Sequence, residues 1–193
     1  MPEIDRLDPT QYRRIPWKNG RGALLVIARE GGDTWEGMGI AWHFGRTAIV
    51  ENGPFSDLSG YERLQTVIKG SGLVLVTPTG EIDLRQPLRP QRYDGGIPIV
   101  TRLENGPVEV VNLIADRRQF SIDLRVGESG APVNCNAGVH IVYAPVGPAR
   151  VAVDGQDFVL PEDNALRITG HTGRAIAVRS GSPLIASIIP RSA

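Results

Sequence analysis

Short apolar runs interrupted by glycine and proline constrain the fold of this chain more than any other feature. Its 193 residues include 23 glycines and 15 prolines, spread along the whole sequence. Runs such as Leu24–Ile27, Leu73–Val76 and Ile185–Ile189 have the length of strands, and no segment keeps an apolar face at helical spacing for more than about three turns. Phe120–Val126 alternates apolar and polar residues, as a half-buried strand does. The pattern predicts an all-β chain, with one helix around Asp5–Tyr12.

Two segments repeat the same order of strand, turn and strand. Gly72–Leu84 and Ala149–Leu160 each follow an apolar strand and a glycine-containing turn, and a proline comes soon after each. Such repeats indicate two similar β-domains in one chain, although hairpins are common enough for a chance likeness. We expect the boundary in the Gly-, Ser-, Pro- and Asn-rich stretch 127–136. The halves would then be residues 1–126 and 127–193, with exchange of strands between them allowed.

Charge and composition exclude several classes of protein. The 21 Lys and Arg residues balance the 21 Asp and Glu residues, so no positive excess marks a nucleic-acid-binding surface. The longest apolar stretches are too short to span a bilayer, and Met1–Arg14 has no apolar signal core. Cys135 is the single cysteine, which rules out an intrachain disulfide and fits a reducing compartment. We expect a cytoplasmic protein without nucleic-acid or membrane partners.

The three histidines, His43, His140 and His171, lie far apart in the sequence. Metal sites in β-barrels typically combine a close His-x-His pair with a carboxylate and a distant histidine. The spacing favours histidines that serve as ordinary polar or surface residues, so we expect no metal and no other cofactor. A metal-dependent alternative would need His140, His171 and a carboxylate such as Glu162 to converge.

Two segments in the first third of the chain combine residue types suited to a small ligand. In Ile15–Gly22 an aromatic ring stands beside an amide and glycines, which let the backbone approach a ligand closely. The alternative there is a β-turn with Trp17 in the core. Arg63 follows Gly53–Ser56 and begins an expected strand. If Arg63 points into a barrel, its guanidinium needs an anion, and otherwise it is a solvated strand end.

A third segment lies near residue 112. Asn112 alternates with apolar neighbours, so its side chain can face the same interior as Arg63. The basic pair Arg117 and Arg118 follows, for which a surface turn is the simpler interpretation.

Taken together, these segments resemble the HutD/Ves family. The resemblance runs over residues 12–118 and rests on motifs in order: Trp17–Gly22, Trp42, Gly53–Ser56 with Gly60 and Arg63, Tyr93–Gly96, Gly106–Val108, Asn112–Ile114 and Arg117. It implies a bicupin, with two jelly-roll-like β-barrel halves packed as one body and without metal histidines. It also implies an accessory or regulatory protein of bacterial histidine utilisation that senses a small metabolite, with no settled enzymatic activity.

The sequence departs from the family pattern at positions that bear on the ligand. Where the family usually has Thr and Glu on the strand after the glycines, this chain has Leu25 and Val26. Arg21 replaces the middle glycine, His43 replaces a strand arginine, and Gly96 replaces the second aspartate. Arg21 and His43 add positive charge that can compensate for the lost polar pair.

The leading hypothesis is a metal-free bicupin that binds a small anionic metabolite, such as a formylated or formimino intermediate of histidine degradation. Arg63 would clamp a carboxylate, while amides and aromatic walls orient it. The expected ligand-binding residues are Trp17, Asn19, Trp42, His43, Ser56, Arg63, Asn112 and Arg117. The rivals are a cupin-type isomerase or hydrolase acting on a small sugar or amino-acid derivative, and a structural module with a degenerate pocket. Exposed strand edges make a homodimer a candidate assembly.

Overall fold

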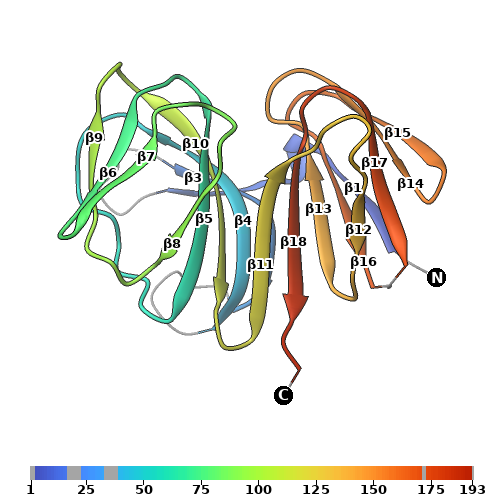
Figure 1. Ribbon diagram of the computed structural model, residues 1–193, viewed down its shortest axis with the longest axis horizontal. Coiled ribbons are helices and arrows are strands. Elements are labelled where there is room, and N and C mark those ends of the chain that lie inside the picture. Colours follow the sequence, from blue (N-terminus) through green and yellow to red (C-terminus); the bar gives the residue numbers. More distant parts are fainter. Residues whose placement is uncertain (1–2, 17–22, 33–38, 171–172, 193) are drawn as a thin grey trace. The chain divides into compact units, whose positions relative to one another are not determined.

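The protein is built from β-strands. The computed structural model describes residues 3–16, 23–32, 39–170 and 173–192 (Figure 1). These residues form strands β1–β18 and one short 3-10 helix, η1 (Pro9–Gln11), and they contain no helix long and apolar enough to cross a membrane. The prediction of an all-β chain is confirmed.

The chain divides into two compact units. The central unit is Arg13–Phe120, and the terminal unit combines Met1–Tyr12 with Ser121–Ala193. The terminal unit is therefore made from both ends of the chain.

The described residues of the central unit form nine strands. They are β2 (Arg13–Pro16), β3 (Ala23–Gly31), β4 (Ile40–Ile49), β5 (Tyr61–Lys69), β6 (Leu73–Thr77), β7 (Gly80–Leu84), β8 (Gln91–Asp94), β9 (Val100–Leu103) and β10 (Val108–Asp116). The larger sheet has the order β2-β3-β4-β10-β5-β8, and the smaller has the order β7-β6-β9. Side chains from both sheets pack into one core cluster, which includes Val67 and Val110 from the larger sheet and Leu73, Leu75 and Leu84 from the smaller.

Burial explains why these runs become strands. The aliphatic run Leu73–Val76 suits a pleated, buried surface, and its turn to β7 is closed by the Thr77 hydroxyl, which donates to the Gly80 carbonyl at 2.8 Å. Leu73, Val74 and Leu75 have no exposed surface. Full burial of such a side chain stabilises the fold by roughly 1.5–3 kcal/mol.

The terminal unit also has two sheets and a core of its own. Its strands are β1 (Glu3–Leu7), β11 (Phe120–Val126), β12 (Val133–Cys135), β13 (Val139–Tyr143), β14 (Ala149–Val153), β15 (Gln156–Leu160), β16 (Ala165–Thr169), β17 (Arg174–Ser180) and β18 (Leu184–Pro190). One sheet has the order β1-β16-β13-β18-β11 and the other β12-β17-β14-β15. Val142, Leu166 and Ile185 of the first sheet pack with Val151, Phe158 and Val178 of the second.

Strand pairing repeats between the units, as the sequence predicts. In the central unit β5 pairs with β8 and β10, and β6 pairs with β7 and β9. In the terminal unit β13 pairs with β16 and β18, and β14 pairs with β15 and β17. The six strands from β5 to β10 therefore correspond in order to the six from β13 to β18.

The expected halves, residues 1–126 and 127–193, differ from these units in two ways. Strand β11 ends at Val126 but pairs with β18, so it belongs to the terminal unit. Strand β1 pairs along its whole length with β16, which places the N-terminus in the terminal unit as well. The glycine-rich stretch 127–136 therefore lies inside a unit, because pairing of distant strands rather than local composition decides membership.

The prediction of a helix around Asp5–Tyr12 is wrong. Its first three residues, Asp5–Leu7, belong to strand β1, and only Pro9–Gln11 turns helically. A reciprocal cap closes that turn: the Asp8 carboxylate accepts from the Thr10 backbone N–H at 2.8 Å, and the Gln11 side chain accepts from the Asp8 N–H at 3.1 Å. Pairing with β16 satisfies the backbone groups that a helix would have used internally.

Candidate functional site

Arg63 lies on the inner face of the larger sheet of the central unit. In β5, Arg63 and Gln65 are on the same side as Val67, which belongs to the core cluster. The strand register places Arg63 beside Tyr93 of β8, and Gln65 beside Asn112 of β10. Because directly paired residues point to the same face, these polar side chains gather in the interior. The structure thus brings Arg63 and Asn112 together, as the alternation in the sequence predicts.

Among the described residues, an amide and two aromatic rings, rather than a carboxylate, contact the guanidinium of Arg63. Arg63 is 7% exposed, and its Nη2 donates to Asn112 Oδ1 at 3.2 Å. Its Cζ lies 4.8 Å from the ring centre of Phe55 and 5.2 Å from that of Tyr93. Each cation–π contact is worth about 0.5–2 kcal/mol. Within the part of the chain that the structure describes, Arg63 has no acidic partner at ion-pair distance.

Unused hydrogen-bond donors remain in this group, which we call the interior cluster (Phe55, Arg63, Gln65, Tyr93 and Asn112). Arg63 Nε is buried and has no acceptor among the described residues. Tyr93 Oη donates to Gln65 Oε1 at 2.6 Å, and burial raises the pKa of Tyr93 to about 12, so this hydroxyl stays protonated. The described residues offer no acceptor to the side-chain nitrogens of Gln65 and Asn112. The interior cluster therefore has unused donors, which suits an anionic ligand.

His43 lies on the same inner face, in β4. It pairs with Ile114 of β10, which is also the cross-strand neighbour of Arg63. Burial, followed by the charges of Arg29 and Arg63, lowers the pKa of His43 to about 3. His43 is therefore a neutral imidazole at neutral pH and does not add the positive charge that the sequence suggested.

Gly45 makes room for the His43 ring. A Cβ on Gly45 would lie 2.7 Å from His43 Nε2 and 2.5 Å from the Leu25 carbonyl oxygen. Val26, where the family usually has a polar residue, pairs with Gly45 and is buried on this same face. The interior beside Asn112 is accordingly less polar than the family pattern implies.

Trp42 points away from the interior cluster. It pairs with Ala115 of β10 and Glu30 of β3, one position along from His43, so it lies on the opposite face of the sheet. The Trp42 side chain is fully buried, and its Nε1 donates to Glu30 Oε2 at 2.9 Å. The expected wall that Trp42 would provide around Arg63 is not present.

Arg117 and Ser56 also lie outside the interior cluster. Arg117 is exposed and forms two hydrogen bonds to the Asp94 carboxylate, at 2.5 and 2.6 Å, which hold the pKa of Asp94 below its usual value. A further bond from Arg117 Nη2 to the Tyr61 carbonyl, at 3.3 Å, ties the end of β10 to β5 and β8. Ser56 is exposed. Trp17 and Asn19 lie outside the described residues.

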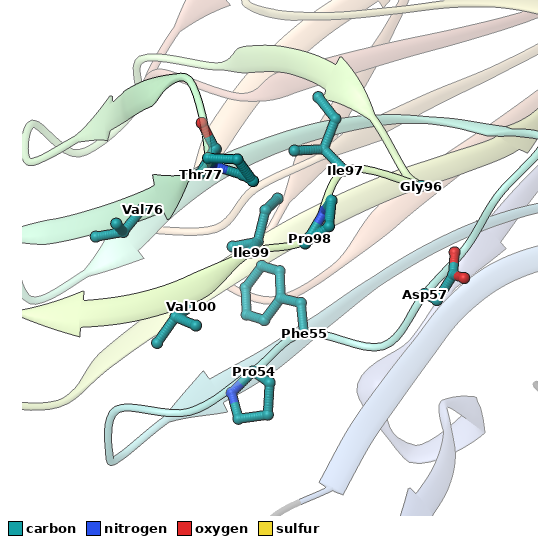
Figure 2. A pocket seen from close by; sticks show the side chains of 11 residues that line it. Pro54, Phe55, Asp57, Val76, Thr77, Gly96, Ile97, Pro98, Ile99 and Val100 are labelled. Carbon is teal, nitrogen blue, oxygen red and sulfur yellow. The ribbon is translucent and has the colours of Figure 1, made fainter.

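A pocket of about 440 Å³ shares Phe55 with the interior cluster (Figure 2). Figure 2 shows the Phe55 ring in the middle of the lining, between Pro54 and Pro98. The lining is mostly apolar and consists of Pro54, Phe55, Asp57, Val76, Thr77, Pro78, Gly96, Ile97, Pro98, Ile99 and Val100. Neither this pocket nor the contribution of Gln65 follows from the sequence motifs, whereas Phe55 and Tyr93 both lie in motifs that it singled out.

The metal-dependent alternative gains no support from the described residues. They include no group of three His, Cys, Asp or Glu side chains placed to hold a metal ion. Both ring nitrogens of His140 are engaged, with Ser187 and with the Asn136 carbonyl. Glu162 accepts from the Gly147 backbone N–H at 3.2 Å, and His171 lies outside the described residues.

Comparison with known proteins agrees with the resemblance. The sequence model of the HutD family matches residues 9–186. A Pseudomonas putida protein described as an uncharacterized 21.2 kDa protein in the hutC 3′ region is 26% identical over 172 residues, covering 89% of this chain and 90% of the relative.

Two solved structures share the fold over nearly the whole chain. HutD from Pseudomonas fluorescens SBW25, in a formate condition, is 29% identical with a TM-score of 0.84, covering 98% of this chain and 100% of that one. A conserved protein of unknown function from Pseudomonas aeruginosa PAO1 is 24% identical with a TM-score of 0.83 and the same coverage. Because the family match spans most of the chain, this protein belongs to the HutD family.

Proposed function

We propose that the central unit binds a small carboxylate in the interior cluster, with Arg63 as the anchor. The single observation that carries this proposal is a buried guanidinium without a carboxylate among the described residues. A buried charge is expensive unless it is paired and hydrogen-bonded. A bound carboxylate supplies the missing charge and accepts from Arg63 Nε.

The ligand is held by charge and by neutral hydrogen bonds. Each hydrogen bond from the guanidinium to a carboxylate oxygen contributes about 1.5–3 kcal/mol. Asn112 already orients Arg63, and the side-chain nitrogens of Asn112 and Gln65 are the neutral donors nearest to it in the strand register. Phe55 and Tyr93 cover the guanidinium and keep water from competing.

Family membership supports a role in histidine utilisation. We infer an accessory or regulatory protein that senses a small anionic intermediate of that route, acting in the cytoplasm without a metal, nucleic acid or membrane. The position of a relative in the hutC 3′ region supports this context, and the formate condition of the solved HutD structure makes formate a natural first probe. We interpret the two units as the halves of a bicupin, and a homodimer as the candidate assembly.

Calorimetric titration of the purified protein with formate, urocanate and N-formylglutamate tests the proposal. We expect at least one of these acids to bind, and Arg63→Ala to remove that binding while the protein stays folded. Arg63→Lys keeps the charge but loses the planar fork, so it should recover only part of the affinity.

Arg118→Ala is the matched control, because the Arg118 side chain is 86% exposed and lies outside the interior cluster. Unchanged affinity in a folded Arg63→Ala variant would remove Arg63 from the site. Binding of none of the acids by the wild-type protein would contradict the proposed function.

A further inference from the structure

A second polar pair lies inside the terminal unit. His140 of β13 and Ser187 of β18 are direct cross-strand partners, and His140 Nδ1 lies 2.9 Å from Ser187 Oγ. The other ring nitrogen, His140 Nε2, lies 3.0 Å from the Asn136 carbonyl oxygen. Neither contact enters the function proposed for the central unit.

The two contacts decide which ring nitrogen of His140 carries the proton. A carbonyl oxygen can only accept, so Nε2 must donate to Asn136. In a neutral imidazole, Nδ1 then has a free lone pair, and the Ser187 hydroxyl must donate to it. Burial lowers the pKa of His140, which favours this neutral form. The serine proton is thus directed at a base whose orientation is fixed by a third group.

The pair lies at an accessible end of the core of the terminal unit. Val142, two residues after His140, pairs with Ile185, two residues before Ser187, and both belong to the core cluster. His140 is 2% exposed, whereas Ser187 is only partly buried and Asn136 is exposed. Ser187 therefore keeps some exposed surface, while the base behind it is shielded.

The strand repeat sets this pair apart from the interior cluster. The Leu88 backbone N–H donates to the Val67 carbonyl, and the Asp163 N–H donates to the Ala144 carbonyl, so Val67 corresponds to Ala144 in the strand repeat. Four residues before each of them, His140 stands at the position of Arg63. Ser187, the cross-strand partner of His140, stands at the position of Ile114, the cross-strand partner of Arg63. The terminal unit thus replaces an anion-binding arginine with a serine and an imidazole.

We propose that Ser187 and His140 are a nucleophile and its general base, which give the terminal unit a site for acyl transfer from small carboxylic esters. Ser187 Oγ attacks the acyl carbon, and its proton moves to His140 Nδ1. The C–O bond of the ester breaks, and the leaving alcohol takes that proton. Water then attacks the acyl-serine with His140 again accepting a proton, which releases the carboxylic acid and restores the hydroxyl. A serine hydrogen-bonded to a base that a third group orients is the arrangement such chemistry requires.

Labelling of the full-length protein with diisopropyl fluorophosphate tests the proposal without an identified substrate. The Ser187 oxygen displaces fluoride from phosphorus and leaves a stable adduct, which peptide mass spectrometry locates. We expect the adduct on Ser187, none at that position in Ser187→Ala, and labelling at least about 100-fold slower in His140→Gln, the lower end of what a general base contributes. p-Nitrophenyl acetate should show a matching burst of p-nitrophenol.

Ser56 is the internal control, because it is exposed and makes no imidazole contact among the described residues. Labelling of Ser187 no faster than Ser56 in the wild-type protein would overturn the proposal, even where His140→Gln fails to fold. Equal labelling of Ser187 in the wild type and in a folded His140→Gln variant would also overturn it.

Discussion

At the scale of single residues, His43 makes stability depend on pH. Its pKa is about 3 in the folded protein, against about 6.5 when unfolded. Between these values the unfolded chain binds more protons, so acidification from pH 7 favours unfolding. Lowering the pH from 7 to 5 should cost about 2 kcal/mol of unfolding free energy through this group.

Urea denaturation of the wild type and of His43→Gln at pH 7 and pH 5 measures this effect. The pKa of His140 is also lowered by burial, so this residue likewise destabilises the fold on acidification. Because His140 is present in both proteins, its effect cancels when their losses of unfolding free energy are compared. A loss on acidification that is equal in both proteins would show that His43 titrates normally.

Gly45 is a second residue whose replacement has a defined consequence. Gly45→Ala would place a methyl group too close to the Leu25 carbonyl oxygen and to the His43 ring, so both of these groups would have to shift. Overpacking of this kind costs about 1–3 kcal/mol, measured as a lower urea midpoint. Gly53→Ala is the matched control, because a Cβ there meets nothing within 4 Å and its φ is not positive. Similar midpoints for the two variants would contradict the packing argument.

At the scale of elements, strand β1 ties the N-terminus to the terminal unit. All five of its residues pair with β16, and Tyr12 Oη, just beyond it, donates to the Asp163 carbonyl at 2.6 Å. Deletion of residues 1–12 should therefore expose one edge of β16 and lower the protection of its backbone amides against hydrogen exchange. The amides of β5 and β10 provide the internal reference. Equal loss of protection in both units would refute a local role for β1.

Individual elements also show where reasoning from sequence succeeds. The alternation in β5 and β10 correctly placed Arg63 and Asn112 in one interior, because a strand turns alternate side chains to one face. By the same alternation, the adjacent residues Trp42 and His43 must point to opposite faces of the sheet. The motif pattern alone suggested that both line one pocket. Arg117 was expected at the ligand, but it pairs with Asp94, a residue of another motif. Such pairs join distant segments, so strand spacing within one segment cannot reveal them.

At the scale of the whole molecule, the strand repeat does not duplicate the anion site. The terminal unit has His140 at the position that corresponds to Arg63, and burial lowers the pKa of this histidine, which favours a neutral imidazole over a positive charge. Calorimetric titration with an acid that binds should accordingly give one site per chain. Arg63→Ala should abolish all of the heat of binding rather than half of it. A stoichiometry of two would show that the terminal unit holds an anion without an arginine.

By itself the sequence determined the all-β character, the repeat and the family, because alternation, turn residues and ordered motifs are local properties of the chain. The tertiary structure decided which strands belong to which unit, since β1 and β11 join partners that lie far away in sequence. It also decided that Tyr93 and Gln65, rather than Trp42, complete the surroundings of Arg63. Cross-strand register sets these contacts, and register depends on how whole sheets bury their apolar faces against each other.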